Sequence, residues 1–166
     1  MKYISTYGKH FLEPWTRIVN LSLTEDVLLG QMHEKGRYNI RLAERRWVTT
    51  EWVPASRENV DIWMDILTDT TTRDGFSQNS RTYYEAFLST LEKNNAWGLL
   101  FAFYEGRVIA AGIWVFSDEV AIYYYGASIS DRELRKHMAP YLLQWEAMRE
   151  GKRRNCQYYD FLGIAP

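Results

Sequence analysis

The sequence predicts an α+β fold in which a mixed, mostly antiparallel sheet is flanked by helices. Three observations support this class. Residues 97–127 contain apolar runs separated by two turn signals, which is typical of an antiparallel meander. Amphipathic helical patterns precede and follow this segment. An apolar run resumes after the last helical pattern, so a further strand can join the sheet.

The composition is that of an ordinary globular domain. The chain has 166 residues, of which 46% are hydrophobic and 25% are charged, so it is long enough to bury a core. A net charge of −1 gives no general attraction for nucleic acid, and any site for a polyanion must therefore be local. Cys156 is the single cysteine, which excludes an internal disulfide and suits a reducing compartment.

Targeting and metal signals point to a cytoplasmic protein without a metal site. The first residues carry no apolar run like that of a signal peptide, and no stretch approaches the length of a membrane span. His10, His33 and His137 are far apart in the chain and match no metal-ligand spacing. We expect each of them to be a surface residue.

The first predicted elements are a strand over residues 16–20 and a helix that follows Thr24. Threonine is a favourable N-cap, and the acidic residues Glu25 and Asp26 occupy the first turn, where they complement the helix dipole. Gly36 predicts a break before a second helix.

The second helix carries a basic stripe. Arg37, Arg41 and Arg45 recur every four residues and therefore share one face. A solvated surface is the ordinary interpretation of such a stripe. The next segment, residues 47–53, alternates apolar and polar side chains as a half-buried strand does, and Pro54 ends it.

Two more helices are predicted before the meander, over residues 57–71 and after Ser80, which is a favourable N-cap. The turns of the meander are expected at Glu105-Gly106 and Ser117-Asp118. A long helix over residues 137–152 follows, with Pro140 tolerated in its first turn. The last residues predict the closing strand.

The last strand of the meander, "AIYYYGAS", contains three consecutive tyrosines. Because side chains alternate along a strand, we expect Tyr123 and Tyr125 on one face and Tyr124 on the other. Two phenols beside a backbone opened by Gly126 would suit the lining of a polar cleft. Core packing is the alternative, because tyrosine is a favoured strand residue.

The order of elements resembles the N-acyltransferase fold of the GNAT superfamily. In that fold the strand after the meander splays from the strand that follows the long helix, and acyl-group chemistry occurs in the gap. The resemblance implies that the tyrosines line this gap. Members that use coenzyme A carry a glycine-rich pyrophosphate loop before the long helix. Here the same place reads "GASISDRELRKHMAP", so we expect neither coenzyme A nor another cofactor.

Four motifs in family order resemble the FemABX family, the aminoacyltransferases that build peptidoglycan cross-bridges. They are "KGRYNIRLAERRWV", "TTRDGF", "YYYGAS" and "APYLLQWEAMREGKRRNCQYYDFLGIAP". The resemblance implies transfer of an amino acid from aminoacyl-tRNA to the peptide stem of a peptidoglycan precursor, which is UDP-linked or lipid-linked. It also implies a location in the cytoplasm or at the inner face of the cell membrane.

Members of this family are usually about twice as long and contain two acyltransferase-like domains in tandem. By comparison with them, residues 1–46 resemble the closing segment of the first domain, and residues 47–166 resemble the second domain without its final strands. The fold is then incomplete at both ends relative to the family. Exposed sheet edges are expected, and with them a homodimer or a missing partner segment.

The resemblance also implies site residues. Tyr123 and Tyr125 match strand tyrosines that contact the precursor, and Tyr84 matches another phenol of that site. Arg73 or Arg81 lies where a phosphate-binding arginine is expected, and the planar guanidinium suits a diphosphate.

Three further assignments keep two interpretations each. Arg37 and Arg41 either contact the tRNA or the precursor, or belong to a surface helix. Asp160 either accepts a proton during transfer or is structural and accepts amide hydrogen bonds, and a tyrosine or the substrate itself could accept the proton instead. No covalent nucleophile is needed, since the ester donor is already activated.

Two other functions compete with that of an aminoacyltransferase or a fragment of one. The first is a catalytically silent binding module that keeps the cleft. The second is an N-acyltransferase that uses another donor, such as acyl carrier protein.

Overall fold

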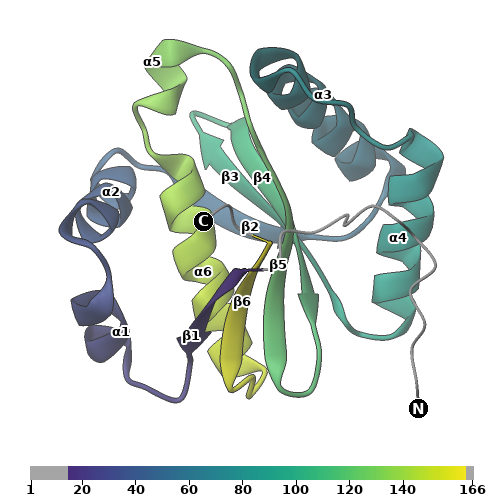
Figure 1. Ribbon diagram of the computed structural model, residues 1–166. Coiled ribbons are helices and arrows are strands. Elements are labelled where there is room, and N and C mark those ends of the chain that lie inside the picture. The colour runs from purple at the N-terminus through teal and green to yellow at the C-terminus, as the bar shows by residue number, and fades with distance from the viewer. Residues whose placement is uncertain (1–14, 164–166) are drawn as a thin grey trace.

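The computed structural model describes residues 15–163, which form one six-stranded sheet with helices on both faces (Figure 1). The strand order is β1-β6-β5-β4-β3-β2. In chain order the elements are β1 (Thr16–Asn20), α1 (Glu25–Gln31), α2 (Glu34–Arg45), β2 (Thr49–Val53), α3 (Arg57–Asp74), α4 (Arg81–Lys93), β3 (Trp97–Tyr104), β4 (Arg107–Phe116), β5 (Val120–Ser128), α5 (Arg132–Arg135), α6 (Ala139–Arg153) and β6 (Tyr158–Gly163). The predicted α+β class, with a mixed and mostly antiparallel sheet, is confirmed.

The helices form two layers around the sheet. α6 lies on one face with α1 and α2 outside it, while α3 and α4 cover the other face (Figure 1). Large side chains from both faces are fully buried, including Trp63 and Tyr84 on the α3–α4 side and Trp114 and Tyr159 on the α6 side. Burial of such aromatic side chains is the main source of stability in a core of this kind. No helix within residues 15–163 is long and apolar enough to cross a membrane.

The meander has the predicted strands and turns. β3, β4 and β5 pair antiparallel in sequence. The first turn places Glu105 and Gly106 at φ 50° and 76°, and glycine adopts such a conformation at little cost. In the second turn Ser117 N donates to Val120 O (2.9 Å).

Two predicted boundaries near the N-terminus are wrong. Gly36 does not break a helix but lies inside α2, which begins at Glu34. The break occurs at Met32 and His33, because the His33 side chain caps the helix by accepting from Lys35 N (3.2 Å). The next strand begins at Thr49 rather than at Trp47, whose φ of 59° lies in the left-handed region.

The later helices differ from the prediction mainly at their ends. α3 continues past residue 71 to Asp74, where Gly75 (φ 74°) ends it in the left-handed conformation. The short helix α5 was not predicted. α6 starts at Ala139, and Pro140 lies in its first turn as expected.

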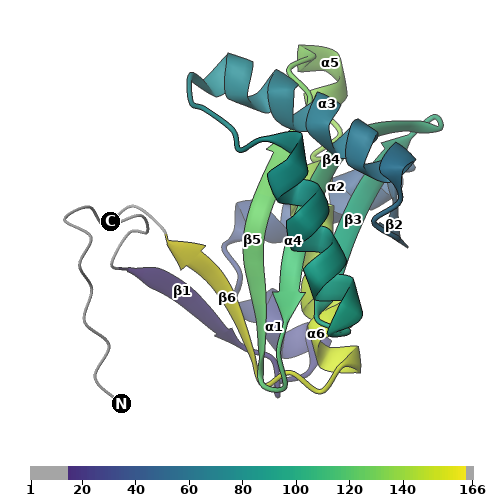
Figure 2. The ribbon, with the colours of Figure 1, turned by 90° about the vertical axis from the view of Figure 1, so that its right-hand side faces the viewer.

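The sheet opens between β5 and β6. These strands pair in parallel only over Val120–Ile122 and Tyr158–Asp160, although β5 continues to Ser128. β6 instead pairs antiparallel with β1, and these two strands lean away from β5 (Figure 2). The expected splay is therefore present. β1 belongs to the same sheet as β2–β6, and the domain boundary at residue 46 stays a prediction.

Candidate functional site

A cavity of about 290 Å³ lies where β5 and β6 part. Four elements enclose it: the C-terminal half of α3, β4, the open part of β5 and the first turns of α6. Its lining consists of Thr70, Arg73, Asp74, Phe76, Ala111, Trp114, Tyr123, Gly126, Ala127, Ser128, Pro140, Leu143 and Gln144. Apolar walls with a few convergent polar groups are typical of a small-molecule site.

A β-bulge separates the two tyrosines that were predicted to share a face. Ile113 pairs with Tyr125, but the next residue of β4, Trp114, pairs with Tyr123, so Tyr124 is an extra residue in β5. Since Ile113 and Trp114 point to opposite faces, Tyr123 and Tyr125 do so too. The predicted shared face is wrong, because period-2 alternation fails across a bulge.

Tyr123 is the tyrosine that enters the cavity. Its ring packs beside Trp114, with centroids 5.3 Å apart, and lies over Gly126. A Cβ at position 126 would overlap the Tyr123 hydroxyl, so glycine is required by this close approach. Burial raises the pKa of the Tyr123 hydroxyl, and a hydrogen bond with Gln144 offsets part of that rise. The phenol is therefore protonated at neutral pH.

A buried polar chain supports this wall of the cavity. Trp114 Nε1 donates to the Tyr159 hydroxyl (2.6 Å), which in turn donates to Gln144 Oε1. Burial raises the pKa of Tyr159 well above its usual value. Because each member has a partner, the chain fixes the Gln144 side chain beside Tyr123.

Tyr125 lies on the opposite face in an aromatic cluster under α4. Its hydroxyl is 3.0 Å from the Tyr83 hydroxyl and accepts from Asn79 Nδ2 (3.4 Å). Burial, with the neighbouring phenol of Tyr83, raises the pKa of Tyr125. Tyr84 belongs to the same cluster but is only 2% exposed and packs edge-on against Trp63. The structure therefore places Tyr84 in the core, and its predicted ligand contact is not supported by exposure.

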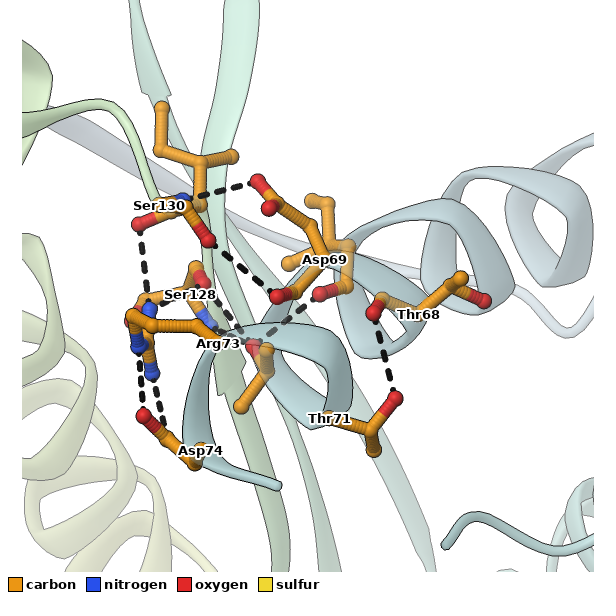
Figure 3. Close-up of polar contacts among 10 residues, drawn as sticks. Thr68, Asp69, Thr71, Arg73, Asp74, Ser128 and Ser130 are labelled. Carbon is orange, nitrogen blue, oxygen red and sulfur yellow. Dashed lines mark hydrogen bonds and ion pairs between the residues drawn. The ribbon is translucent and has the colours of Figure 1, made fainter. Parts of the chain in front are cut away.

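Arg73 reaches from α3 to the end of β5 and lines the cavity (Figure 3). Its Nη1 donates to Ser128 O (2.9 Å) and to Ile129 O (3.2 Å), and its Nε pairs with Asp74 (2.7 Å). A side-chain hydrogen bond from Arg73 lowers the pKa of Asp74. Arg73 is thus held in a fixed position at the cavity, paired with Asp74, and its predicted contact with a phosphate stays a prediction.

Two more contacts join α3 to the segment after β5. Thr70 Oγ1 accepts from Ser128 N (2.8 Å). Asp69 Oδ2 accepts from Ser130 N (2.7 Å) (Figure 3). The side-chain hydrogen bond from Ser130 lowers the pKa of Asp69. We call this set of contacts the α3–β5 clamp, defined by Asp69, Thr70, Arg73, Ser128 and Ser130. It keeps the open end of β5 in place although β6 no longer pairs with it.

The other predicted arginines lie elsewhere. Arg81, at the start of α4, pairs with Asp61 and with Glu85 (3.2 Å), and it does not line the cavity. Arg37 Nη1 donates to the carbonyls of Leu29, Gly30 and Met32, so it caps the end of α1. Arg41 is exposed on α2.

Asp160 and Cys156 also lie outside the cavity lining. Asp160 Oδ1 accepts from Leu162 N (2.8 Å) and from the Thr16 hydroxyl, so it joins β6 to β1. These contacts fit the structural interpretation of Asp160. Burial raises the pKa of the Cys156 thiol, which disfavours the reactive thiolate. Within residues 15–163 no group of three His, Cys, Asp or Glu side chains could hold a metal ion.

The start of α6 offers few free amides to an anion. Pro140 has no N–H, Tyr141 N is bonded to Met138 O (3.0 Å), and Met138 takes the N-cap position in the left-handed conformation. This geometry agrees with the absence of a glycine-rich loop in the sequence.

Six polar or aromatic lining residues were not predicted as site residues: Thr70, Asp74, Phe76, Trp114, Ser128 and Gln144. Gln144 follows two buried leucines on α6, and no motif distinguishes it from a surface glutamine. Ser128 is the last residue of the strand "AIYYYGAS", and its position close to the tyrosines in the sequence could have identified it as a lining residue. Trp114 reads as an ordinary core residue.

The sequence matches one family, and no curated protein matches it. Residues 33–165 match the family described as "Acetyltransferase (GNAT) domain". The match covers most of the chain, including every residue that lines the cavity.

Several solved structures share the fold. The structure named FemX has a TM-score of 0.83 at 18% identity, and the alignment covers 90% of this chain and 52% of that one. The C-terminal domain of a lysylphosphatidylglycerol synthetase from Agrobacterium fabrum follows, with a TM-score of 0.67, 14% identity and coverage of 91% and 46%. L-PGS from Bacillus licheniformis has a TM-score of 0.60 at 13% identity, and the alignment covers 90% of this chain and 45% of that one. The chain therefore spans about half the length of these proteins.

Proposed function

Because the chain belongs to the acetyltransferase (GNAT) domain family, we propose that it transfers an acyl group to an amine in the cavity at the β5–β6 fork. We further propose that the acyl group is an amino acid carried by aminoacyl-tRNA, and that the amine belongs to the peptide stem of a peptidoglycan precursor. The sequence motifs that resemble FemABX enzymes support this choice. The FemX-like fold over 90% of the chain is consistent with it.

The reaction is the aminolysis of an ester. The lone pair of the acceptor amine attacks the ester carbonyl carbon, and a tetrahedral oxyanion forms. The C–O bond to the tRNA ribose then breaks, the amine loses a proton, and the ribose oxygen gains one. The products are an amide and a free ribose hydroxyl, so no covalent enzyme intermediate or external oxidant is needed. The protein must align the two substrates and stabilise the developing negative charge.

The Tyr123 hydroxyl is the observation that carries the proposal. It lies in the cavity at the fork, and burial keeps it protonated, so it can donate a hydrogen bond to the oxyanion or to the leaving oxygen. Gln144 lines the cavity beside this hydroxyl, and the Arg73 guanidinium, which is paired with Asp74, lines the same cavity. We assign to Arg73 the role of attracting an anionic part of a substrate.

The start of α6 supports a donor other than coenzyme A. Its first turn contains a proline and a paired amide, so it lacks the set of free N–H groups that binds a pyrophosphate. An ester-linked donor on tRNA does not require that site at this helix.

The test is an aminoacyl-transfer assay with charged tRNA and a peptidoglycan precursor. We expect the wild-type protein to form the amide and Tyr123→Phe to lower kcat by about 10²-fold, the usual effect of removing one donor to an oxyanion. Tyr158→Phe is the matched control, because Tyr158 is 45% exposed and does not line the cavity. Equal rates for both variants would remove Tyr123 from the mechanism. Precursor binding without any transfer would favour the silent binding module.

A further inference from the structure

We propose that a basic groove between the end of α2 and α5 binds the RNA part of the donor. The groove is a concave surface of about 600 Å³, lined by Arg45, Arg46, Trp47, Tyr104, Glu133, Leu134, Lys136 and His137. This inference rests on the proposed function, since only a tRNA-linked donor would need such a surface. Arg45, Arg46 and Trp47 lie within the motif "KGRYNIRLAERRWV", but no functional role for Arg46 or Trp47 was predicted from the sequence.

Two arginines of the groove, Arg45 and Arg46, carry positive charge that no carboxylate pairs with in the described residues. Within residues 15–163 no salt bridge includes Arg45 or Arg46, and Lys136 pairs with Glu133 (2.7 Å). Arg41 lies one turn before Arg45 on the same helix and extends the charged surface. The arrangement differs from the end of α6, where each basic side chain of a cluster pairs with glutamates: Arg149, Arg153 and Arg154.

Trp47 is exposed at the edge of this groove in a costly conformation. Its side chain is 84% exposed, and its φ of 59° lies in the left-handed region just after α2, where glycine is preferred. Backbone N–H groups hold the turn, since Trp47 N donates to Glu44 O (3.0 Å) and Val48 N to Ala43 O (3.1 Å). A tryptophan here adds no core packing. It does offer a flat ring beside two arginines, which suits stacking with an unpaired base.

The floor of the groove is rigid. The rings of Tyr104 and His137 lie 3.8 Å apart between centroids, and Arg46 Nη1 donates to Lys136 O (2.5 Å). His137 was expected at the surface, but its Nδ1 is buried and has no hydrogen-bond partner within the described residues. These contacts fix the end of α2 against α5, so the positive charges are held in a defined position before a ligand arrives.

The groove lies close to the cavity at the fork, because His137 of the groove and Pro140 of the cavity lie near each other in the chain. Arg135, on α5, is close enough to Asp74 to help lower the pKa of that carboxyl, after the larger effect of Arg73. Asp74 lines the cavity, and Lys136, the next residue after Arg135, lines the groove. A chain of phosphates lying in the groove would therefore end near the place where the ester must react.

Single-stranded RNA fits these features better than a membrane surface. Arginines beside aromatic rings in a concave surface are typical of sites that bind phosphates and stack bases. Membrane attachment requires a broad exposed apolar face, and Trp47 is the single large apolar side chain of this groove that is mostly exposed.

The test measures RNA binding without any transfer step. The probe is a fluorescein-labelled, uncharged RNA minihelix with a single-stranded 3′ end, and its anisotropy is followed at several salt concentrations. We expect Trp47→Gly to weaken binding about tenfold while the thermal unfolding temperature stays the same or rises, because glycine relieves the left-handed strain. We expect the double variant R45A/R46A to weaken binding and to lower the slope of log K against log salt by up to about 2.

The matched control is R149A/R153A, which removes the same charge from the paired cluster on α6 and should bind as the wild type does. Equal weakening by both double variants would overturn the inference, as would binding of phosphatidylglycerol vesicles through Trp47 without RNA binding.

The transfer assay distinguishes the groove proposal from the proposed function. If the groove variants transfer amino acids normally, the groove assignment fails and the function stands. If the minihelix binds in the groove but no amide forms, the proposed transfer function is rejected and the RNA-binding groove is kept.

Discussion

At the scale of single residues, the candidate site depends on a contact between a phenol and a glycine. Tyr123 lies over Gly126, and the space that a side chain would need at position 126 is taken by the Tyr123 ring and hydroxyl. The Trp114 ring packs beside Tyr123 and is itself fixed by its hydrogen bond to Tyr159. Specific packing of this kind leaves little tolerance for added volume.

We expect Gly126→Ala to destabilise the protein by about 1–3 kcal/mol and to lower transfer activity, because the added methyl group must displace the Tyr123 ring. Calorimetry and the transfer assay measure the two effects. Gly36→Ala is the control: a Cβ there meets no atom within 4 Å, and alanine is the better helix former. An alanine at 126 that leaves both stability and transfer unchanged would show that the ring is free to move aside.

Residue roles were the least predictable part of the site. The sequence indicated Tyr123 and Arg73, and both line the cavity. Arg37 and Arg81 were also candidates, but neither lines the cavity, because Arg37 binds carbonyls at the end of α1 and Arg81 binds carboxylates near the start of α4. Which partner an arginine finds is decided by residues distant in the sequence, and this information is not present in local spacing.

At the scale of elements, the α3–β5 clamp replaces the missing strand partner. Ser128 and Ser130 follow the point where β6 leaves the sheet, and their backbone N–H groups donate to Thr70 and Asp69 instead of to a strand. Unpaired backbone groups are costly when they are shielded from water. The clamp thus allows β5 to end beside a cavity without losing its hydrogen bonds there.

The Asp69 part of the clamp predicts a dependence of stability on pH. Its pKa is lowered in the folded state, chiefly by the hydrogen bond from Ser130, so the ionised carboxylate stabilises the fold above the unfolded pKa of about 4. This contribution is lost as the pH falls through the lowered folded pKa. We expect Asp69→Asn to cost up to about 1 kcal/mol at pH 7, because solvent partly screens the group, and to cost less below pH 4.

Urea unfolding of wild type and Asp69→Asn between pH 3 and pH 7 measures this difference. Asp65→Asn, one turn earlier on α3, is the control, since no hydrogen bond to the Asp65 side chain is found within residues 15–163. A difference between wild type and Asp69→Asn that grows toward low pH would contradict the assigned sign.

Element order could be predicted well from the sequence, and boundaries less well. Apolar periodicity and turn residues are local signals, so the meander and the long helices follow from them. The start of α2 was misplaced because the His33 cap outweighs the glycine at position 36. Trp47 was placed in a strand by its apolar side chain, whereas hydrogen bonds at the end of α2 hold it in a turn.

At the scale of the whole molecule, the open sheet has an exposed edge at β1. Trp15 is 65% exposed and Ile18 is 57% exposed, and no strand within the described residues pairs with the outer side of β1. Edge strands with exposed apolar side chains favour association with other strands. The homodimer suggested by the sequence comparison stays a prediction, and this edge is where we expect it to form.

We expect sedimentation velocity to detect self-association of the wild type that rises with concentration, and we expect Ile18→Lys to weaken it, because a charged side chain on an edge strand disfavours pairing. Val27→Lys is the control, since Val27 is 45% exposed but lies on helix α1. A wild-type protein that remains monomeric at every concentration would contradict the prediction.

The extra residue at Tyr124 has a consequence for the transfer of residue roles between homologues. In a homologue without this bulge, the side chains on one side of position 124 would point to the opposite faces of the sheet, even where the aligned residues are identical. Roles assigned by counting along an alignment would then exchange the phenol that lines the cavity for one that faces α4. Comparative annotation in this superfamily should therefore follow strand partners through space, using Trp114 as the reference point, rather than column numbers.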